Sequence, residues 1–245
     1  MKRVKIDLQS ALQLSASKPS SGLKKVSSEN LDVEYTVLLP AAVADELMAQ
    51  LQQSVEYYEG DLTKVLRILL FVLVNYEGVI RSVKVFGKWH EIPRQQVAYG
   101  DEGMKYTFSG VTIKAKPWIP ILIDVRDMLH TISGYQYNFV LINRYRNGKD
   151  HIGEHRDDEK EMDKNTPIAS LSLGEKRTFV LKHRDARIKR PSRRDIPPVK
   201  IELEHGSLLL MNPPTNEYWY HSVPPRKSAK GVRINLTFRK INLLS

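Results

Sequence analysis

The feature that most constrains the fold is a series of short strand-like segments that fills the chain after residue 84. They lie at 83–89, 106–110, 139–145, 168–173, 178–182, 199–203, 207–211 and 232–238. Each is rich in β-branched or aromatic residues, and Gly, Pro or Asn separates many of them. Many short strands with turn residues between them are typical of a β-sandwich or barrel.

A helical region precedes these segments. Pro40 can open a helix, and Val43, Leu47, Leu51 and Val55 recur every four residues, which predicts one apolar stripe on that helix. A strand is expected just before it, over 33–39, because apolar residues alternate there, and a short helix is expected around 121–130.

The N-terminal residues have a different composition. Residues 1–32 are rich in Ser and Lys and poor in large apolar groups, so we predict a flexible N-terminal tail. One folded domain is expected over 33–245. Its most apolar stretch, 65–74, is too short to cross a bilayer, which needs about 20 apolar residues, and no membrane partner is expected.

Charge and cysteine content narrow the chemistry. The 245 residues carry a formal charge of +10, which favours a polyanionic partner such as nucleic acid, although solubility charge is an equal explanation. The chain has no cysteine, so thiolate metal sites and cysteine nucleophiles are excluded. Any metal must bind to His, Asp, Glu or backbone oxygen.

One short motif has the spacing of a metal site. In an extended chain His155 and Asp157 project to the same side and can reach one ion, leaving a third ligand to come from a distant strand. Two histidines and one carboxylate bind Fe(II) and leave positions open. A salt-bridged surface histidine is the alternative. Spacing alone does not choose the third ligand among His183, His205 and His221.

The same letters, His-Arg-Asp, begin a kinase catalytic loop. That loop requires Asn five residues after the Asp, where this chain has Met162, and the glycine-rich loop and Asp-Phe-Gly are also missing. A kinase is therefore excluded.

The last strand has two contrasting faces. Val232, Ile234, Leu236 and Phe238 share one face, and the polar residues at 233, 235, 237 and 239 share the other. The polar face either meets water or lines a polar barrel interior, where an arginine can bind a carboxylate.

Four motifs now resemble a known family: Asn143-Arg-Tyr145, His155-Arg-Asp157, Trp219-Tyr-His221 and Arg233-Ile-Asn-Leu-Thr-Phe-Arg239. In order and spacing they resemble the AlkB family of Fe(II)- and 2-oxoglutarate-dependent nucleic-acid dealkylases. Stretches at 85–90, 106–110, 116–120 and 151–158 are similar to its AlkB homologue 2 subgroup, the duplex-DNA repair enzymes. The resemblance covers 33–64 and 84–242.

The resemblance implies an α+β fold with a double-stranded β-helix (jelly-roll) core, N-terminal helices and a nucleotide-recognition lid of β-hairpins over 84–115. It implies the cofactors Fe(II), 2-oxoglutarate and O2, with His155, Asp157 and His221 as the iron ligands. The residues expected to bind 2-oxoglutarate are Asn143, Tyr145, Arg233, Asn235 and Arg239. The implied reaction is oxidative demethylation of 1-methyladenine and 3-methylcytosine in double-stranded DNA, with release of formaldehyde, succinate and CO2.

A base inside a duplex must be flipped out before it can react. The subgroup's finger hairpin resembles 85–87, so Phe86 is expected to fill the gap in the base stack. The residues expected around the flipped base are Tyr106, Phe108, Ser109, His155, Asp158 and Glu159. For the two acidic residues a solvated turn is an equal alternative.

A basic run lies at 182–194, with seven Lys or Arg and one Asp. It predicts a DNA-binding loop over 182–196 that binds phosphates. The residues expected to contact DNA are Val85, Phe86, Gly87, Lys88, Arg94, Lys182, Arg187, Lys189, Arg190 and Arg193. Residues 66–83 have no counterpart in the family and are either an insertion or an artefact of the gene model.

The expected partner is double-stranded DNA with alkylated bases, and the protein is expected to be a nuclear monomer. The N-terminal residues lack the aromatic groups of sliding-clamp-binding motifs, so clamp recruitment is not expected. Two alternatives remain: the same chemistry on single-stranded DNA or RNA, and a non-catalytic nucleic-acid-binding module.

Overall fold

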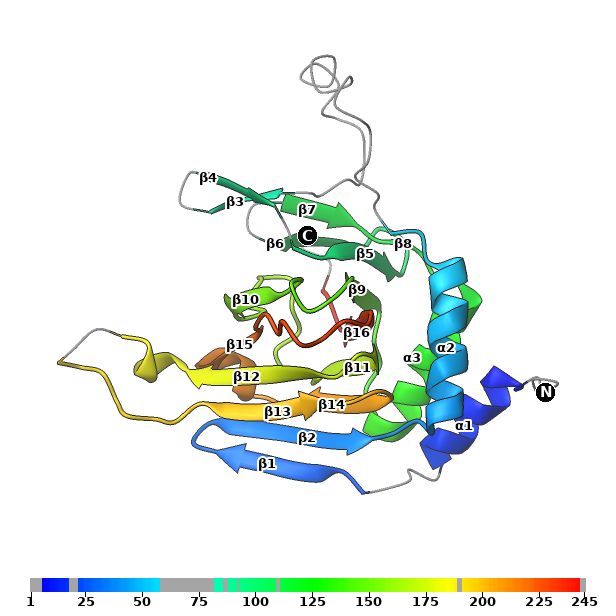
Figure 1. Ribbon diagram of the computed structural model, residues 1–245, viewed down its shortest axis with the longest axis horizontal. Coiled ribbons are helices and arrows are strands. Elements are labelled where there is room, and N and C mark those ends of the chain that lie inside the picture. Colours follow the sequence, from blue (N-terminus) through cyan, green and yellow to red (C-terminus); the bar gives the residue numbers. More distant parts are fainter. Residues whose placement is uncertain are drawn as a thin grey trace, which may run out of the picture.

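The computed structural model describes residues 6–17, 22–57, 82–85, 88–91, 93–108, 111–188 and 191–242. At 82–85, 88–91, 107, 108 and 111 only the backbone is described. The fold is an eight-stranded sheet and a four-stranded sheet, with two hairpins beyond one end and helices on one side (Figure 1).

The large sheet has the strand order β1-β2-β14-β11-β16-β9-β5-β8. Its strands are β1 (Lys24–Ser28), β2 (Leu31–Val37), β5 (Gln95–Gly100), β8 (Lys116–Pro117), β9 (Phe139–Tyr145), β11 (Ile168–Gly174), β14 (Ser207–Met211) and β16 (Arg233–Arg239). Every pairing is antiparallel except that of β5 with β8.

The small sheet has the order β10-β15-β12-β13, with β10 (Ile152–His155), β12 (Arg177–His183), β13 (Val199–Leu203) and β15 (Trp219–Val223). The hairpins are β3 (Ser82–Val85) with β4 (Lys88–Glu91), and β6 (Lys105–Phe108) with β7 (Val111–Lys114). A short 3-10 turn, η1 (Arg184–Ala186), follows β12, and the short helix α4 (Thr215–Tyr218) leads into β15.

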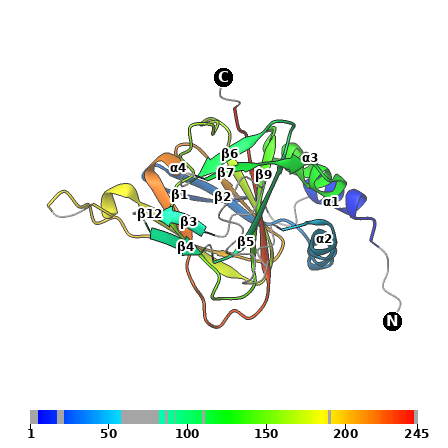
Figure 2. The ribbon, with the colours of Figure 1, turned by 90° about the horizontal axis from the view of Figure 1, so that it is seen from above.

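Three longer helices gather along one side of the large sheet (Figures 1 and 2). They are α1 (Leu8–Ser17), α2 (Ala41–Ser54) and α3 (Pro120–Ser133). The expected stripe is confirmed for α2, because Leu47 and Leu51 are fully buried against the sheet. In the described part of the chain, no helix is long and apolar enough to cross a bilayer.

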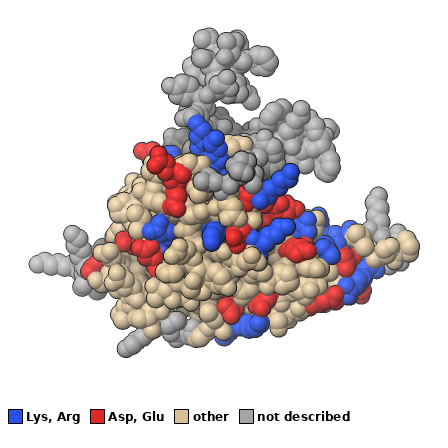
Figure 3. Space-filling model, turned by 180° about the vertical axis from the view of Figure 1, so that it is seen from behind, with Lys and Arg blue, Asp and Glu red and all other residues tan. Residues whose placement is uncertain are grey.

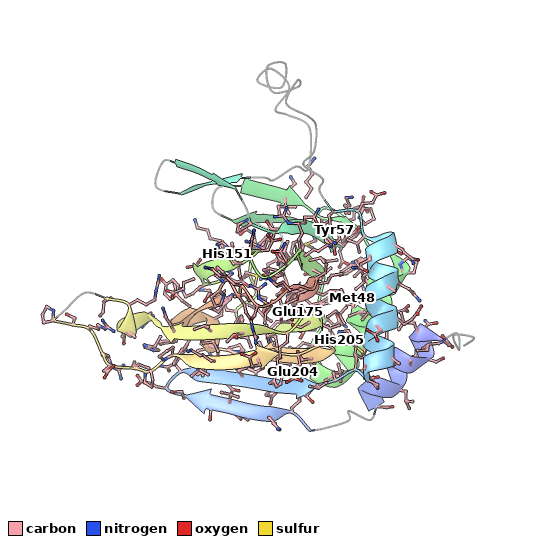
Figure 4. All side chains as sticks on the ribbon, viewed as in Figure 1. Met48, Tyr57, His151, Glu175, Glu204 and His205 are labelled. Carbon is pink, nitrogen blue, oxygen red and sulfur yellow. The ribbon has the colours of Figure 1, made fainter. Side chains whose placement is uncertain are left out.

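The turns at one end of the sheets are attached to α2 through a histidine (Figure 4). The Gly174 N–H donates to Nδ1 of His205 at 2.7 Å, and Nε2 of the same ring lies 3.2 Å from Asp45 of α2. Gly174 adopts a positive φ of 84°, and a side chain there would collide with Met48 and the backbone of Val232. The glycine is therefore required where the turn meets the helix.

The prediction of a flexible tail over 1–32 is wrong for most of the described residues. Leu8 and Leu12 of α1 are buried among the residues of α2 and α3, and β1 pairs with β2 at the edge of the large sheet. Three polar contacts hold the β1–β2 turn in place. Trp219 donates to the carbonyl of Glu29, Arg194 forms an ion pair with the Glu29 carboxylate, and the Asp32 N–H donates to Thr215. Composition gave the wrong prediction for this segment because a few leucines on one face are enough to bury a short helix against an existing core.

Two other predicted boundaries differ from those in the structure. The predicted lid at 84–115 is interrupted, because β5 belongs to the large sheet and, among the described residues of this range, only the β3–β4 and β6–β7 hairpins stand apart from it. The basic loop predicted over 182–196 starts inside β12 and includes η1. Of the segment 66–83, all but 82–83 lies outside the described residues.

Candidate metal centre

A pocket lies between the two sheets and takes its lining from both. The large sheet contributes Gln96, Asn143, Tyr145, Arg233 and Asn235, and the small sheet contributes His155, Phe179 and His221. The polar face of β16 therefore lines an interior: Arg233 is 1% exposed and Arg239 is 4% exposed. Of the two explanations for that face, the polar interior is correct.

Three ligand-type side chains converge in this pocket. One ligand atom each of His155, Asp157 and His221 lies within 4.8 Å of the others, and this is the one such cluster among the described residues. His155 ends β10 and faces His221 of β15 in the strand register, with the ring centres 4.2 Å apart. Strand pairing thus brings together ligands far apart in sequence.

The other two candidate histidines lie elsewhere. His205 contacts Gly174 and α2, as described above (Figure 4). His183 is buried with its ring against Trp219, and its Nδ1 accepts from the Asp185 N–H. Tertiary placement therefore selects His221.

The protonation states suit a divalent cation. Burial, with a smaller contribution from neighbouring His155, lowers the pKa of His221 to about 3. Burial also lowers the pKa of His155, so both rings are neutral at physiological pH. Burial alone would raise the pKa of Asp157, but the adjacent Arg239 guanidinium and both histidines hold it well below its usual range. Two neutral imidazoles and a carboxylate are the donor set of a facial Fe(II) site.

The ligands are held by a second set of contacts. Nδ1 of His155 lies 2.9 Å from the Gly153 carbonyl, which fixes the ring orientation and directs Nε2 toward Asp157 at 3.6 Å. Arg239 donates from Nε and Nη2 to Oδ2 of Asp157, at 3.1 and 2.6 Å. The side chain of Asn216 brackets the backbone of Asp157: the Asp157 N–H donates to Oδ1 at 3.1 Å, and Nδ2 donates to the Asp157 carbonyl.

A separate corner of the pocket suits an anion. Nη2 of Arg233 donates to Ser172 at 3.0 Å and to Asn235, while its Nε and Nη1 are buried without a hydrogen-bond partner. Its guanidinium lies 5.0 Å from the centre of the Tyr145 ring. Unpartnered buried donors are costly unless a ligand satisfies them, and a carboxylate is the natural acceptor for arginine. The residues present thus fit both a divalent metal and a carboxylate cosubstrate.

The 2-oxoglutarate residues predicted from the resemblance all line this pocket, but their roles differ. Arg239 makes its closest polar contacts with Asp157, so its main role is to orient that candidate metal ligand. Oδ1 of Asn143 is already occupied, because Arg94 Nε and Gln96 Nε2 donate to it at 2.8 and 2.9 Å.

The structure contradicts the role predicted for Arg94. It was expected on the DNA backbone, yet its guanidinium points inward, to Asn143 and the His151 carbonyl. Gln96 was missed altogether. The spacing of 94 and 96 on one face of a strand was the available signal, and the apolar neighbours of these residues hid it.

The residues expected around a flipped base divide into three groups. Tyr106 and Glu159 line the pocket and hydrogen-bond to each other, and burial raises the pKa of Glu159 to about 7, with a further contribution from Asp157. Asp158 instead lies outside this pocket, paired with Arg156 at 2.9 Å and with its side chain 64% exposed. The Phe108 side chain and Ser109 lie outside the described residues.

The expected DNA contacts are only partly described. Val85 and Lys88 lie on the β3–β4 hairpin, of which the backbone alone is described, and Phe86, Gly87, Lys189 and Arg190 lie outside the described residues. Arg193 is exposed. Lys182 and Arg187 are both paired with the same carboxylate, that of Glu154.

Comparison with known proteins agrees with this geometry. Residues 35–239 match the model of the 2OG-Fe(II) oxygenase superfamily. The chain is 51% identical over 214 residues to the DNA oxidative demethylase ALKBH2 of Mus musculus, covering 87% of this chain and 82% of the relative. It is 50% identical over 220 residues to the Homo sapiens protein of the same name, covering 90% of this chain and 77% of that protein.

A solved structure described as "The structure of OsALKBH1" shares the fold, with a TM-score of 0.54, 16% identity, and coverage of 89% of this chain and 100% of that one. The α+β fold expected from the sequence is confirmed at this level. The chain belongs to the 2OG-Fe(II) oxygenase superfamily and, within it, to the family of the ALKBH2 DNA oxidative demethylases.

Proposed function

We propose that this protein removes alkyl groups from damaged DNA bases by Fe(II)- and 2-oxoglutarate-dependent oxidation. The observation that carries the proposal is the coincidence, in one pocket, of two neutral histidines and one carboxylate with the unpartnered donors of Arg233. One part suits Fe(II) and the other suits a dicarboxylate.

Each residue has a definite task in this proposal. His155, Asp157 and His221 hold the metal, and Arg239 and Asn216 orient Asp157 toward it. When bound, Fe(II) and 2-oxoglutarate supply the O2-dependent oxidation that hydroxylates the alkyl carbon, which then leaves as formaldehyde.

The remaining pocket residues bind the cosubstrate and the base. Arg233 binds the distal carboxylate of 2-oxoglutarate beside Tyr145, and the buried side chains around it exclude water. Glu159, with Tyr106 beside it, contacts the polar edge of the base. Asp158 faces away from this pocket and is omitted from that role.

We further propose that the two sheets form a double-stranded β-helix core with the hairpins as a nucleotide-recognition lid. In Figure 1 the β3–β4 and β6–β7 hairpins lie on the side of the molecule opposite to β1 and β2, and Tyr106 of β6 lines the pocket. The preferred substrate is duplex DNA carrying 1-methyladenine or 3-methylcytosine, reached by base flipping, with the finger at 85–87 in the gap. A chromosomal substrate implies nuclear localisation, and imaging of a tagged protein checks it. The protein is proposed to act as a monomer.

The test is incubation of the purified chain with Fe(II), 2-oxoglutarate and a duplex carrying one 1-methyladenine, with formaldehyde and the restored base as readouts. We expect turnover by the native chain and none by His155→Ala, which lacks a metal ligand. A parallel single-stranded oligonucleotide measures strand preference. Activity confined to single strands would refute the duplex assignment, and equal signals from the native chain and His155→Ala would refute the enzymatic one.

A further inference from the structure

The outer face of the small sheet carries a carboxylate between two cations. Lys182 of β12 bonds to Oε1 of Glu154 on β10, and Arg187 donates to Oε2 at 3.1 Å. Both oxygens of one carboxylate are therefore occupied by cations of the basic loop. Because these hydrogen bonds favour the charged carboxylate, Lys182 first and Arg187 after it keep the pKa of Glu154 below its usual range.

This cluster lies on the face opposite to the metal. Leu181 pairs with His221 and Lys182 pairs with Tyr220, so residues 182 and 220 project away from the pocket. Glu154 directly precedes His155 on β10, so its side chain also projects away from the pocket. The Arg187 guanidinium also stacks on Tyr220, 3.7 Å from the ring centre, and Arg156 lies 4.8 Å from the same ring. Arg187 is thus held by a carboxylate and by an aromatic ring.

The other described ion pairs of the basic loop have a different arrangement. Arg194 is bound by both oxygens of Glu29 and by Asp185, which ties the end of the loop to the β1–β2 turn. Arg184 stacks on Tyr218 at 4.2 Å and lies 3.7 Å from Asp185, its neighbour in sequence. In Figure 3, blue and red groups are interspersed over the described residues at the back of the molecule.

The Lys182–Glu154–Arg187 cluster has the donor set of a phosphate site. A phosphate oxygen accepts from lysine and arginine as a carboxylate oxygen does, and all three side chains are partly open to solvent, with 44%, 30% and 35% of their surface exposed. A phosphate approaching these cations also meets the negative charge of Glu154, which is already paired with both of them.

We propose that Glu154 is an internal competitor of the DNA backbone: its carboxylate occupies the place between Lys182 and Arg187 that a DNA phosphate takes on binding. Glu154 thereby lowers the affinity for DNA and reduces its salt dependence, since its one negative charge already offsets one of the two positive charges of Lys182 and Arg187. The inference rests on the proposed action on DNA and deepens it by assigning the residue that sets the strength of backbone binding.

The experiment compares Glu154→Gln with Glu202→Gln, each measured against the native chain by fluorescence anisotropy on an unmodified duplex oligonucleotide. Glu202 is the matched control, because it is also an exposed carboxylate of the small sheet that pairs with an arginine (Arg226) and a second donor (Thr178). Both substitutions raise the net charge by the same amount, so a difference between them reports position and not total charge.

We expect Glu154→Gln to bind about two- to fivefold more tightly, the size of effect that an exposed ion pair allows. The slope of log K against log salt should steepen by about one unit between about 50 and about 200 mM salt, because a further phosphate contact then releases counterions. Glu202→Gln should lie close to the native chain in both quantities.

A Glu154→Gln chain that binds no more tightly than Glu202→Gln would overturn the inference. Weaker binding would do so too, since Glu154 would then orient the cations for DNA. Lys182→Gln gives a second test that does not depend on one variant: its loss of affinity should be larger in the Glu154→Gln background than in the native one. Equal losses would also overturn the inference. The demethylation assay of the native chain tests the proposed function separately from this inference. The native chain can demethylate DNA whether or not Glu154 competes with a phosphate.

Discussion

At the scale of single residues, the candidate metal ligands are held in place by side chains that are not themselves candidate ligands. Asn216 is the clearest case, because its amide pairs with both the N–H and the carbonyl of Asp157. Asp157 lies just beyond the end of β10, where no strand partner fixes its backbone. The asparagine supplies the missing pairing and so fixes the direction of the carboxylate.

Replacing Asn216 by Ala should therefore weaken metal binding about tenfold or more, the usual effect of removing a partner of a metal ligand. Titration with Mn(II) in place of Fe(II) measures the affinity without turnover. Asn165→Ala is the control, because Asn165 is exposed. Unchanged Mn(II) affinity in Asn216→Ala would show that the backbone of Asp157 is fixed by other means.

Residue patterns in the sequence predicted only some of the residues of this site. The His155–Asp157 spacing and the polar face of β16 were visible because both repeat at the period of a strand. Asn216, Arg94 and Gln96 were not, since each acts through a partner from a distant segment and no local pattern marks it.

At the scale of elements, α1 shows where composition fails. The helix is short and rich in Ser, yet Leu12 is 1% exposed and packs in the core with α2 and α3. Its partner surface exists only after the large sheet and the other helices have assembled. Strands such as β9, β11 and β16 were predictable from their own apolar and β-branched residues, whereas β1, β5, β10 and β15 were not predicted.

The element-scale prediction compares two leucines of α1. Leu12→Ala should lower the free energy of unfolding by about 2–5 kcal/mol, through the lost burial and the cavity left behind, provided that α1 unfolds with the core. Leu14→Ala should change it by about 0.5 kcal/mol or less, because Leu14 is 62% exposed. Urea unfolding followed by circular dichroism measures both, and equal midpoints would show that α1 is not part of the cooperative unit.

At the scale of the whole molecule, the pocket joins the two sheets. The candidate metal ligands His155 and His221 belong to the small sheet, whereas Arg233 and Arg239 belong to β16 of the large one. Ligands that bind between the sheets should therefore stabilise the entire fold and not one region of it.

Thermal unfolding tests this coupling. A metal at about 100 times its dissociation constant adds about 2.7 kcal/mol to the free energy of unfolding, so Mn(II) should raise the melting temperature, and 2-oxoglutarate should raise it further. His155→Ala should lose the Mn(II) response. Arg233→Met should keep the Mn(II) response and lose the one to 2-oxoglutarate. A response to 2-oxoglutarate that survives in Arg233→Met would place the dicarboxylate elsewhere.

The sequence by itself predicted several of the strands, the apolar stripe of α2 and the family, and the resemblance to that family implied the three candidate metal ligands. These features are short-range periodicities and motifs, and a strand or helix expresses them wherever it lies. Only the tertiary structure decided that α1 belongs to the core, that Arg94 faces the pocket, that Arg239 holds Asp157, and that Glu154 pairs with both Lys182 and Arg187. Those outcomes depend on which distant strands pair and on the charges that the pairing brings together. Local patterns in the sequence do not show which strands pair.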